Sequence, residues 1–263
     1  MLSRKWDYDQ FKAFFYKKTG LDLESYKDRQ MERRIRQFME REKKTDFWLF
    51  FKHLGESPTV MERFMNYLTI NTSEFFRDGK VYATLQNIII PELIKMNPRY
   101  FTVWSAGCSI GAEPYTVAII FDLLNVLNRA RIIATDIDQN ILQVAKKGLY
   151  NLKQLGKTKE EIIKKYFVKE GSNYLIKPKI KEAVKFKIHN LLLDRPLPNN
   201  SMIFCRNVFI YFKQSVQEFL LGQFAKSLKK GGFLIIDSAE YINDPEKYGF
   251  TKRFNTIYQK KNP

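Results

Sequence analysis

One segment constrains the fold of this chain most: a loop of small residues between an apolar run and a helical pattern. Residues 103–115 read Val-Trp-Ser-Ala-Gly-Cys-Ser-Ile-Gly-Ala-Glu-Pro-Tyr. The sequence predicts a strand over 101–104, a loop over 105–111 and a helix that begins near Glu113. Small residues let a ligand approach the backbone at the carboxyl end of the strand. In an open α/β sheet, ligands bind at that end.

An acidic residue at the end of the next apolar run indicates what this ligand contains. Residues 131–135 predict a second strand, which ends at Asp136 within the sequence Ala-Thr-Asp-Ile-Asp. An acidic residue at this place can bind ribose hydroxyls. The loop and Asp136 together predict a site for a ligand with a ribose.

The glycine spacing and one carboxylate narrow the choice of ligand. Gly107 and Gly111 are spaced G-x-x-x-G, so both the dinucleotide pattern G-x-G-x-x-G and a Walker loop are missing from this loop. Glu113, at the predicted helix N-terminus, would repel a pyrophosphate and suits an amine or a cation. S-adenosylmethionine fits, since it has a ribose, an amino group and a sulfonium but no phosphate.

Composition limits the class of protein. The 263 residues are 44% hydrophobic, enough for a sizeable core in one large or two smaller domains. No apolar run in the sequence reaches the ~18 residues of a membrane helix. Two cysteines and two histidines exclude a cysteine-rich disulfide scaffold and show no zinc-site spacing. We therefore expect a metal-free protein of the reducing cytoplasm.

The charge points to an anionic partner. The chain has 45 Lys and Arg against 28 Asp and Glu, a net charge of +17. Such a surface attracts nucleic acid, an anionic membrane or an acidic protein. Composition alone favours nucleic acid.

Patterning divides the chain into three parts. Residues 1–70 show apolar positions at helical spacing and predict a small all-helical domain. Residues 71–98 predict a linker and a joining helix. Residues 99–263 alternate strand and helix, which predicts a mostly parallel sheet. Within this part, 157–183 predict an inserted antiparallel β-subdomain and 254–260 an edge strand.

Three more segments carry candidate chemistry. Residues 71–77 read Asn-Thr-Ser-Glu-Phe-Phe-Arg, which fits either a binding segment or a helix N-cap followed by core aromatics. Residues 190–192, Asn-Leu-Leu, follow the third strand, either near an adenine or as a plain turn. Residues 205–212, Cys-Arg-Asn-Val-Phe-Ile-Tyr-Phe, follow the fourth strand. They lack the prolines of the loop that base-directed amino-methyltransferases carry there, and Tyr211 alternatively packs among its aromatic neighbours.

The helix predicted over residues 26–44 has two faces. Three apolar residues line one: Met31, Ile35 and Phe38. Three arginines line the other: Arg29, Arg33 and Arg36. The arginine face suits either simple solvation or docking onto an acidic helical surface.

Together these segments resemble the CheR family, the chemotaxis receptor (protein-glutamate) O-methyltransferases. They occur in family order and at family spacing over essentially the whole chain. The resemblance implies an α/β protein with a small all-helical N-terminal domain. A Rossmann-like class I S-adenosylmethionine-dependent methyltransferase domain with a small antiparallel β insertion would follow. Two departures are Ala112, where the family often has a first glutamate, and Ser201, where it usually has an aspartate.

The resemblance also implies roles for single residues. S-adenosylmethionine, with S-adenosylhomocysteine as product and no metal, would be bound by Asn71, Ser73, Arg77, Glu113, Asp136, Asn190, Leu191, Arg206, Asn207 and Val208. Arg77 and Tyr211 would lie at the reacting centre as catalytic residues. The arginines of the 26–44 helix would face the acidic cytoplasmic helical bundle of a methyl-accepting receptor. The short turn of the insertion resembles members that use no receptor tether.

The implied reaction is methyl transfer to glutamate side chains, which gives glutamate 5-O-methyl esters for sensory adaptation. Glutamate has a pKa of about 4.3 and is ionised at neutral pH, so the reaction needs no general base. The expected protein is a monomer without nucleic-acid partner or membrane insertion. Two alternatives stay open: a nucleic-acid methyltransferase and a catalytically silent S-adenosylmethionine-binding adaptor.

Overall fold

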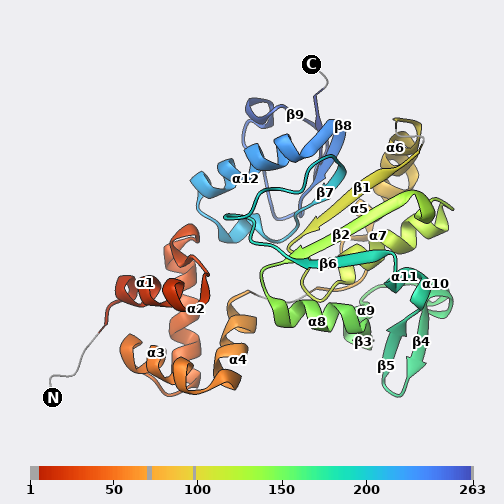
Figure 1. Ribbon diagram of the computed structural model, residues 1–263. Coiled ribbons are helices and arrows are strands. Elements are labelled where there is room, and N and C mark those ends of the chain that lie inside the picture. Colours follow the sequence, from red (N-terminus) through yellow and green to blue (C-terminus); the bar gives the residue numbers. More distant parts are fainter. Residues whose placement is uncertain (1–5, 70–72, 97–98, 262–263) are drawn as a thin grey trace, which may run out of the picture. The chain divides into compact units, whose positions relative to one another are not determined.

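The computed structural model describes residues 6–69, 73–96 and 99–261, and they form two compact units (Figure 1). Of the described residues, the helical unit comprises 6–69 together with 211–217. The sheet unit comprises 73–96, 99–210 and 218–261.

The helical unit is built from capped helices around an aromatic core. Its elements are α1 (Tyr8–Thr19), η1 (Leu23–Ser25), α2 (Asp28–Arg41), α3 (Phe47–Glu56) and α4 (Pro58–Leu68). Asp7 begins α1 with a capping box, and Ser57 caps α4 ahead of Pro58. The ring of Phe64 lies 4.9 Å from that of Phe50 and 5.0 Å from that of Phe38. Such aromatic pairs add specific geometry to the apolar burial that holds the helices together.

Helix α2 is amphipathic in the way the sequence predicts. Its apolar residues Met31, Ile35 and Phe38 are buried. Its arginines Arg29, Arg33 and Arg36 are exposed. The helix is shorter than the predicted range of 26–44, because the backbone of Tyr26 and Lys27 is extended.

The sheet unit contains a seven-stranded sheet in the order β6-β2-β1-β7-β8-β10-β9. Its strands are β1 (Phe101–Ala106), β2 (Ala130–Asp136), β6 (Val184–Ile188), β7 (Asn200–Phe204), β8 (Leu228–Ile235), β9 (Phe250–Phe254) and β10 (Ile257–Lys260). The five strands from β6 to β8 pair in parallel, and β10 and β9 are antiparallel. The chain runs outward in both directions from β1, so the topological switch point lies between β1 and β7. The mostly parallel sheet is thus confirmed.

One strand prediction is wrong. Residues 254–260 do not form the edge, because β10 lies between β8 and β9 and the edge strand is β9. The chain turns back at Asn255 and Thr256 and pairs inward. Apolar side chains at Ile257 and Tyr258, both buried, fit an inner strand.

Helices cover both faces of the sheet. The helices in this part of the chain are α5 (Gly79–Thr84), the π-helical η2 (Leu85–Ile89), α6 (Ile90–Met96), α7 (Ala112–Leu123), η3 (Leu127–Arg129), α8 (Gln139–Lys147), η4 (Phe209–Tyr211), α12 (Gln214–Ser227) and η5 (Pro245–Tyr248), not all of which cover the sheet. On β1, Trp104 packs against Phe224 of α12, whereas Phe101 packs against Phe121 of α7. Side chains three positions apart on a strand point to opposite faces, so α12 and α7 lie on opposite sides. In the described part of the chain, no helix combines the length and apolar composition that a bilayer crossing requires.

The insertion is a three-stranded antiparallel sheet, β3-β5-β4. Its elements are β3 (Leu149–Asn151), α9 (Leu152–Leu155), α10 (Glu160–Tyr166), β4 (Phe167–Glu170), β5 (Asn173–Ile176) and α11 (Pro178–Lys181). The sheet therefore starts before the predicted range of 157–183. A two-residue turn with Gly171 at φ +60° joins β4 and β5.

Candidate functional site

The loops after β1 and β7 meet at a glycine. Gly107 has φ +83°, and a Cβ there would lie 2.7 Å from Cγ2 of Val208. The N–H groups of Gly107 and Cys108 both donate to the Thr135 carbonyl at 2.9 Å, which ties this loop to β2. Only glycine satisfies both the backbone angle and the close approach. The contact with Val208 therefore requires glycine at position 107 of the predicted small-residue loop.

Asp136 ends β2 beside this loop and is held by backbone donors. Its Oδ2 accepts from the Ser109 N–H at 2.8 Å, and its Oδ1 accepts from the Asp138 N–H at 3.1 Å. The backbone of Ile137 donates to this carboxylate as well, so three N–H groups stabilise its negative charge. Burial raises the pKa of Asp136, and the backbone donors oppose that shift. A carboxylate at the end of this strand suits the binding of ribose hydroxyls.

Glu113, in the first turn of α7, is a second carboxylate at the same end of the sheet, and its side chain is 13% exposed. Its Oε1 accepts from the Ser105 hydroxyl at 2.7 Å, and its Oε2 lies 4.0 Å from Nη1 of Arg206. Burial raises the pKa of Glu113, and the positive charge of Arg206 opposes the rise. A carboxylate held in this way suits an ammonium group of a ligand.

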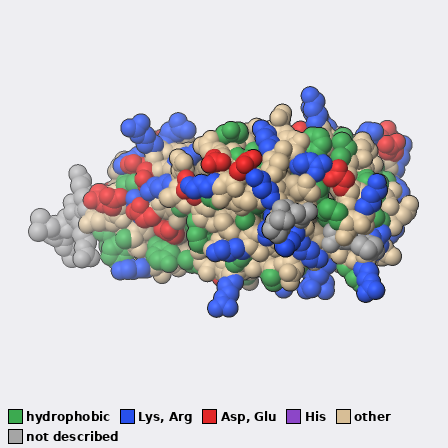
Figure 2. Space-filling model, turned by 90° about the horizontal axis from the view of Figure 1, so that it is seen from above, with side chains coloured by type: hydrophobic (Ala, Val, Ile, Leu, Met, Phe, Trp, Pro, Cys, Tyr) green, Lys and Arg blue, Asp and Glu red, His purple; other side chains and the backbone are tan. Residues whose placement is uncertain are grey.

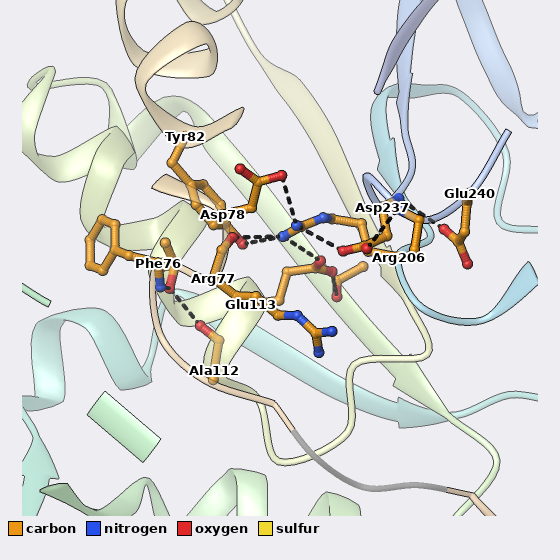
Figure 3. A network of polar contacts seen from close by, with 12 residues as sticks. Phe76, Arg77, Asp78, Tyr82, Ala112, Glu113, Arg206, Asp237 and Glu240 are labelled. Atoms are coloured by element: carbon orange, nitrogen blue, oxygen red, sulfur yellow. Dashed lines mark hydrogen bonds and ion pairs between the residues drawn. The ribbon is translucent and has the colours of Figure 1, made fainter. Parts of the chain in front are cut away.

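Arg206, two residues after the end of β7, is the centre of a polar network (Figure 3). Its Nη1 donates to the Tyr82 hydroxyl and to the Arg77 carbonyl, both at 3.2 Å. Its Nη2 donates to Oδ2 of Asp237 at 3.1 Å and lies 4.0 Å from Asp78. The Arg206 side chain is 3% exposed, so these contacts are shielded from water. The guanidinium thus offsets part of the negative charge of Asp78, Glu113 and Asp237.

Sequence reasoning missed Tyr82, Asp78 and Asp237 as members of this network. Asp237 carried a signal that could have been used. It follows the apolar run of β8, just as Asp136 follows that of β2. An acid at the end of a buried strand faces the same edge of the sheet as the ligand loops.

Glu240 was also missed, and it links two loops. It is 7% exposed, and its Oε2 accepts from the Asp237 N–H at 2.8 Å. Its Oε1 accepts from the Ile210 N–H at 3.4 Å. Asn207, in the same loop as Ile210, has φ +60°. Glu240 therefore fixes the loop after β7 that carries Asn207 and Val208.

Asn190 follows β6, the strand that pairs with β2. Its Oδ1 accepts from the Leu192 N–H at 2.9 Å, and its own N–H donates to Asp194 at 2.8 Å. The Asn190 side chain thus stabilises a turn at residues 190–192, which was one of the two interpretations of this segment from the sequence. His189 N–H donates to the Asp136 carbonyl at 3.0 Å, so this turn begins beside Asp136. A contact of Asn190 and Leu191 with an adenine stays a prediction.

The structure brings some of the predicted site residues together. Gly107 meets Val208, and Arg206 joins the Arg77 backbone to Glu113. Ser73 is described in the sheet unit and is half-buried, whereas Asn71 lies outside the described residues. Tyr211 belongs to the helical unit, as do the arginines of α2.

As the pH is lowered, we expect cofactor affinity to fall at a higher pH than it would if the two carboxylates had ordinary pKa values. Asp136 and Glu113 have raised pKa values, and they bind donors best when ionised. Affinity should be full above the raised values and decline as the pH falls through them, rather than near the usual 3.9 to 4.3 or so. Protonation also removes the free-energy cost of burying a charged carboxylate. The raised pKa values of Asp136 and Glu113 therefore do not destabilise the ligand-free protein as the pH falls.

Calorimetric titration with S-adenosylhomocysteine, in a pH series extended downward until the protein unfolds, measures this dependence. Asp136→Asn, which has no carboxylate to protonate, should flatten part of the profile. A profile identical to that of the unaltered protein would contradict the assignment of Asp136.

Two family models match the chain. Residues 71–258 match "CheR methyltransferase, SAM binding domain", and residues 6–69 match "CheR methyltransferase, all-alpha domain". The first range covers β1, β2, β6 and β7, whose ends carry Asp136, Asn190 and Arg206.

Curated relatives match over nearly the whole chain. A chemotaxis protein methyltransferase of Listeria innocua is 36% identical over 254 residues, 97% of each chain. The chemotaxis protein methyltransferase Cher2 of Pseudomonas putida is 31% identical over 255 residues, 92% of this chain and 93% of its own. Chemotaxis protein methyltransferase 1 of Pseudomonas aeruginosa is 31% identical over 261 residues, with the same two coverages.

Proposed function

We propose that this chain, which belongs to the CheR methyltransferase family, methylates side-chain carboxylates of specific glutamates on chemotaxis receptors. The methyl donor is S-adenosylmethionine, and the products are S-adenosylhomocysteine and glutamate 5-O-methyl esters. The substrate is the cytoplasmic helical bundle of the receptor, which the enzyme reaches as a cytoplasmic monomer.

One observation supports the donor site most strongly: the buried Asp136 carboxylate at the end of β2. It accepts from the Ser109 N–H, so it lies beside the loop that follows β1. In this proposal Asp136 binds both ribose hydroxyls, and Glu113 pairs with the amino group. Asn190 and Leu191 hold the adenine. Asn71, Ser73, Arg77, Arg206, Asn207 and Val208 complete the site.

S-adenosylmethionine supplies an electrophilic methyl group on a sulfonium. A glutamate oxygen forms the new C–O bond as the C–S bond breaks, so no proton is transferred. The protein must align the carboxylate and exclude water from it. Arg77 orients the carboxylate, and the Tyr211 hydroxyl donates a weaker hydrogen bond that leaves the oxygen nucleophilic.

The net charge of +17 favours a second candidate, a nucleic-acid methyltransferase. On the face in Figure 2, Lys and Arg side chains are scattered and mixed with acidic ones, without forming one continuous tract. The loop after β7 reads Asn-Val-Phe-Ile-Tyr and lacks the prolines of base-directed enzymes. Parallel assays with labelled donor distinguish the two: label should enter receptor signalling domains and not duplex DNA or RNA. Nucleic-acid binding with a steep salt dependence but without label would reflect charge alone.

Tyr211→Phe is expected to lower turnover more than cofactor affinity. The change removes a hydroxyl that acts on the substrate carboxylate and leaves the aromatic ring in place. Single-turnover methylation and calorimetry with S-adenosylhomocysteine measure the two effects separately. An unchanged turnover number would show that Tyr211 is a packing residue.

Replacing Arg29, Arg33 and Arg36 together with Ala is expected to raise the KM for receptor and to leave cofactor binding unchanged. All three are exposed on α2, although Arg36 also contacts Glu32 at 2.7 Å. Each exposed pair with the receptor would contribute only about 0.2–1 kcal/mol, so the triple change is needed.

The KM difference should shrink as salt rises, because exposed charges are screened. A control with equal loss of charge replaces Lys17, Lys18 and Lys52, which are exposed on α1 and α3. If both triple variants give the same KM at every salt concentration, the α2 face is not the docking surface.

A further inference from the structure

The segment that carries Tyr211 is anchored to the residues just before α2. The Lys27 N–H donates to the Tyr211 carbonyl at 2.9 Å, and the Lys213 N–H donates to the Ser25 carbonyl at 3.0 Å. Tyr26 and Phe212 form an antiparallel bridge between these two backbone bonds, with ring centroids 4.9 Å apart. The backbone on both sides of Phe212 is therefore paired with the helical unit.

An ion pair reinforces this pairing. Nζ of Lys213 lies 2.9 Å from Asp28, the first residue of α2, and 3.6 Å from Glu24. Asp28 is also 3.5 Å from Nζ of Lys12, whose side chain is 6% exposed. The hydrogen bond from Lys213 lowers the pKa of Asp28, and the same bond raises the pKa of Lys213. The pair thus stays charged across the neutral range.

The ion pair between Asp28 and Lys213 links the segment 211–217 to α2, because Asp28 is the first residue of that helix. Lys27, at the N-cap of α2, forms no side-chain capping bond. The Asp28 carboxylate in the first turn is favoured by the helix dipole, yet it contacts Lys213 in the distant segment 211–217. The same helix carries Arg29, Arg33 and Arg36 on its exposed face.

We propose that Asp28 and Lys213 are positioning residues for Tyr211, and that they couple the α2 surface to the reacting group. The proposal rests on the proposed function, in which Tyr211 acts on the substrate carboxylate and α2 docks the receptor. Without the pair, the segment 211–217 loses the charged contact that fixes its register against α2, and its two backbone bonds, made by the Lys27 and Lys213 amides, open more often.

Lys213→Met and Asp28→Asn test this role. We expect each to lower kcat about ten-fold, because misplacing an aligning group by about 1 Å can cost up to about 100-fold. The dissociation constant of S-adenosylhomocysteine should not change. Lys213→Arg retains the pair and should retain turnover. Asp9→Asn is the matched control, since Asp9 contacts Lys12 at 2.9 Å in the same charged cluster.

A double-mutant cycle separates positioning from general stabilisation. In a Tyr211→Phe background, Asp28→Asn should cause no further loss of kcat if it acts through the Tyr211 hydroxyl. Equal losses in both backgrounds would overturn the proposal.

Hydrogen exchange provides a readout that does not require methyl transfer. The Lys27 and Lys213 amides should lose protection in Lys213→Met, whereas amides of α3 should not. Unchanged protection of both amides would overturn the proposal even if the unaltered protein methylates nothing. Failure of the unaltered protein to methylate receptors, with the loss of protection observed, would instead count against the proposed function.

Discussion

Replacing Arg206 with Met is expected to lower the free energy of unfolding of the sheet unit by about 3–5 kcal/mol. Met has a similar reach but no charge, so Asp237 and Glu113 would be left buried without their common cation. Asp237 is 5% exposed and Glu113 13% exposed at the side chain. Their mutual repulsion, which Arg206 now offsets, would then act in full.

Urea denaturation followed by the fluorescence of Trp104 in β1 measures this loss. Trp6 and Trp48 belong to the helical unit and are replaced with Phe in the reference protein. Arg253→Met is the control in the same unit: Arg253 pairs with Glu92 at 3.1 Å but is 32% exposed, so about 1 kcal/mol or less is expected. A similar loss for the two variants would show that the Arg206 network contributes little.

Asp136→Ala is expected to weaken cofactor binding about ten-fold to a hundred-fold. Hydrogen bonds to a charged group contribute roughly 1.5–3 kcal/mol, and the two ribose hydroxyls would lose their charged acceptor. Asp136→Asn keeps the shape and one acceptor oxygen, so its loss should be smaller.

Calorimetry with S-adenosylhomocysteine measures both affinities. Circular dichroism checks that the variants are folded, because Ala also leaves the Ser109 and Asp138 N–H groups without their acceptor. Unchanged affinity in folded Asp136→Ala would remove the ribose assignment.

Local patterns were sufficient to predict the elements around the donor site. A parallel sheet buries its strands on both faces, so continuous apolar runs revealed β1, β2 and β7. The loop after β1 was recognisable by its small residues. Glycine stands at position 107 because the backbone there has a positive φ and approaches Val208 closely. The two faces of α2 were equally visible from helical periodicity.

Contacts between distant segments were not predictable in the same way. Arg206 lies 124 residues from Tyr82 in sequence, and nothing local to either position marks the hydrogen bond between them. The bridge from Tyr26 to Phe212 likewise joins the segment 211–217 to helices that precede it by most of the chain. β10 is an inner strand because the chain turns at residues 255–256. The apolar pattern of residues 254–260 fitted a single edge strand equally well, so it did not reveal that turn.

The central claim is that this protein esterifies receptor glutamates, and the chemical form of the transferred methyl group tests it most directly. The protein is incubated with labelled S-adenosylmethionine and purified receptor signalling domains, beside Asp136→Ala as the matched control. We predict label on the receptor that mild base releases, as expected for a methyl ester, and strongly reduced label with Asp136→Ala. Label that resists base, as N-methyl groups do, or no label on the receptor at all, would contradict the account.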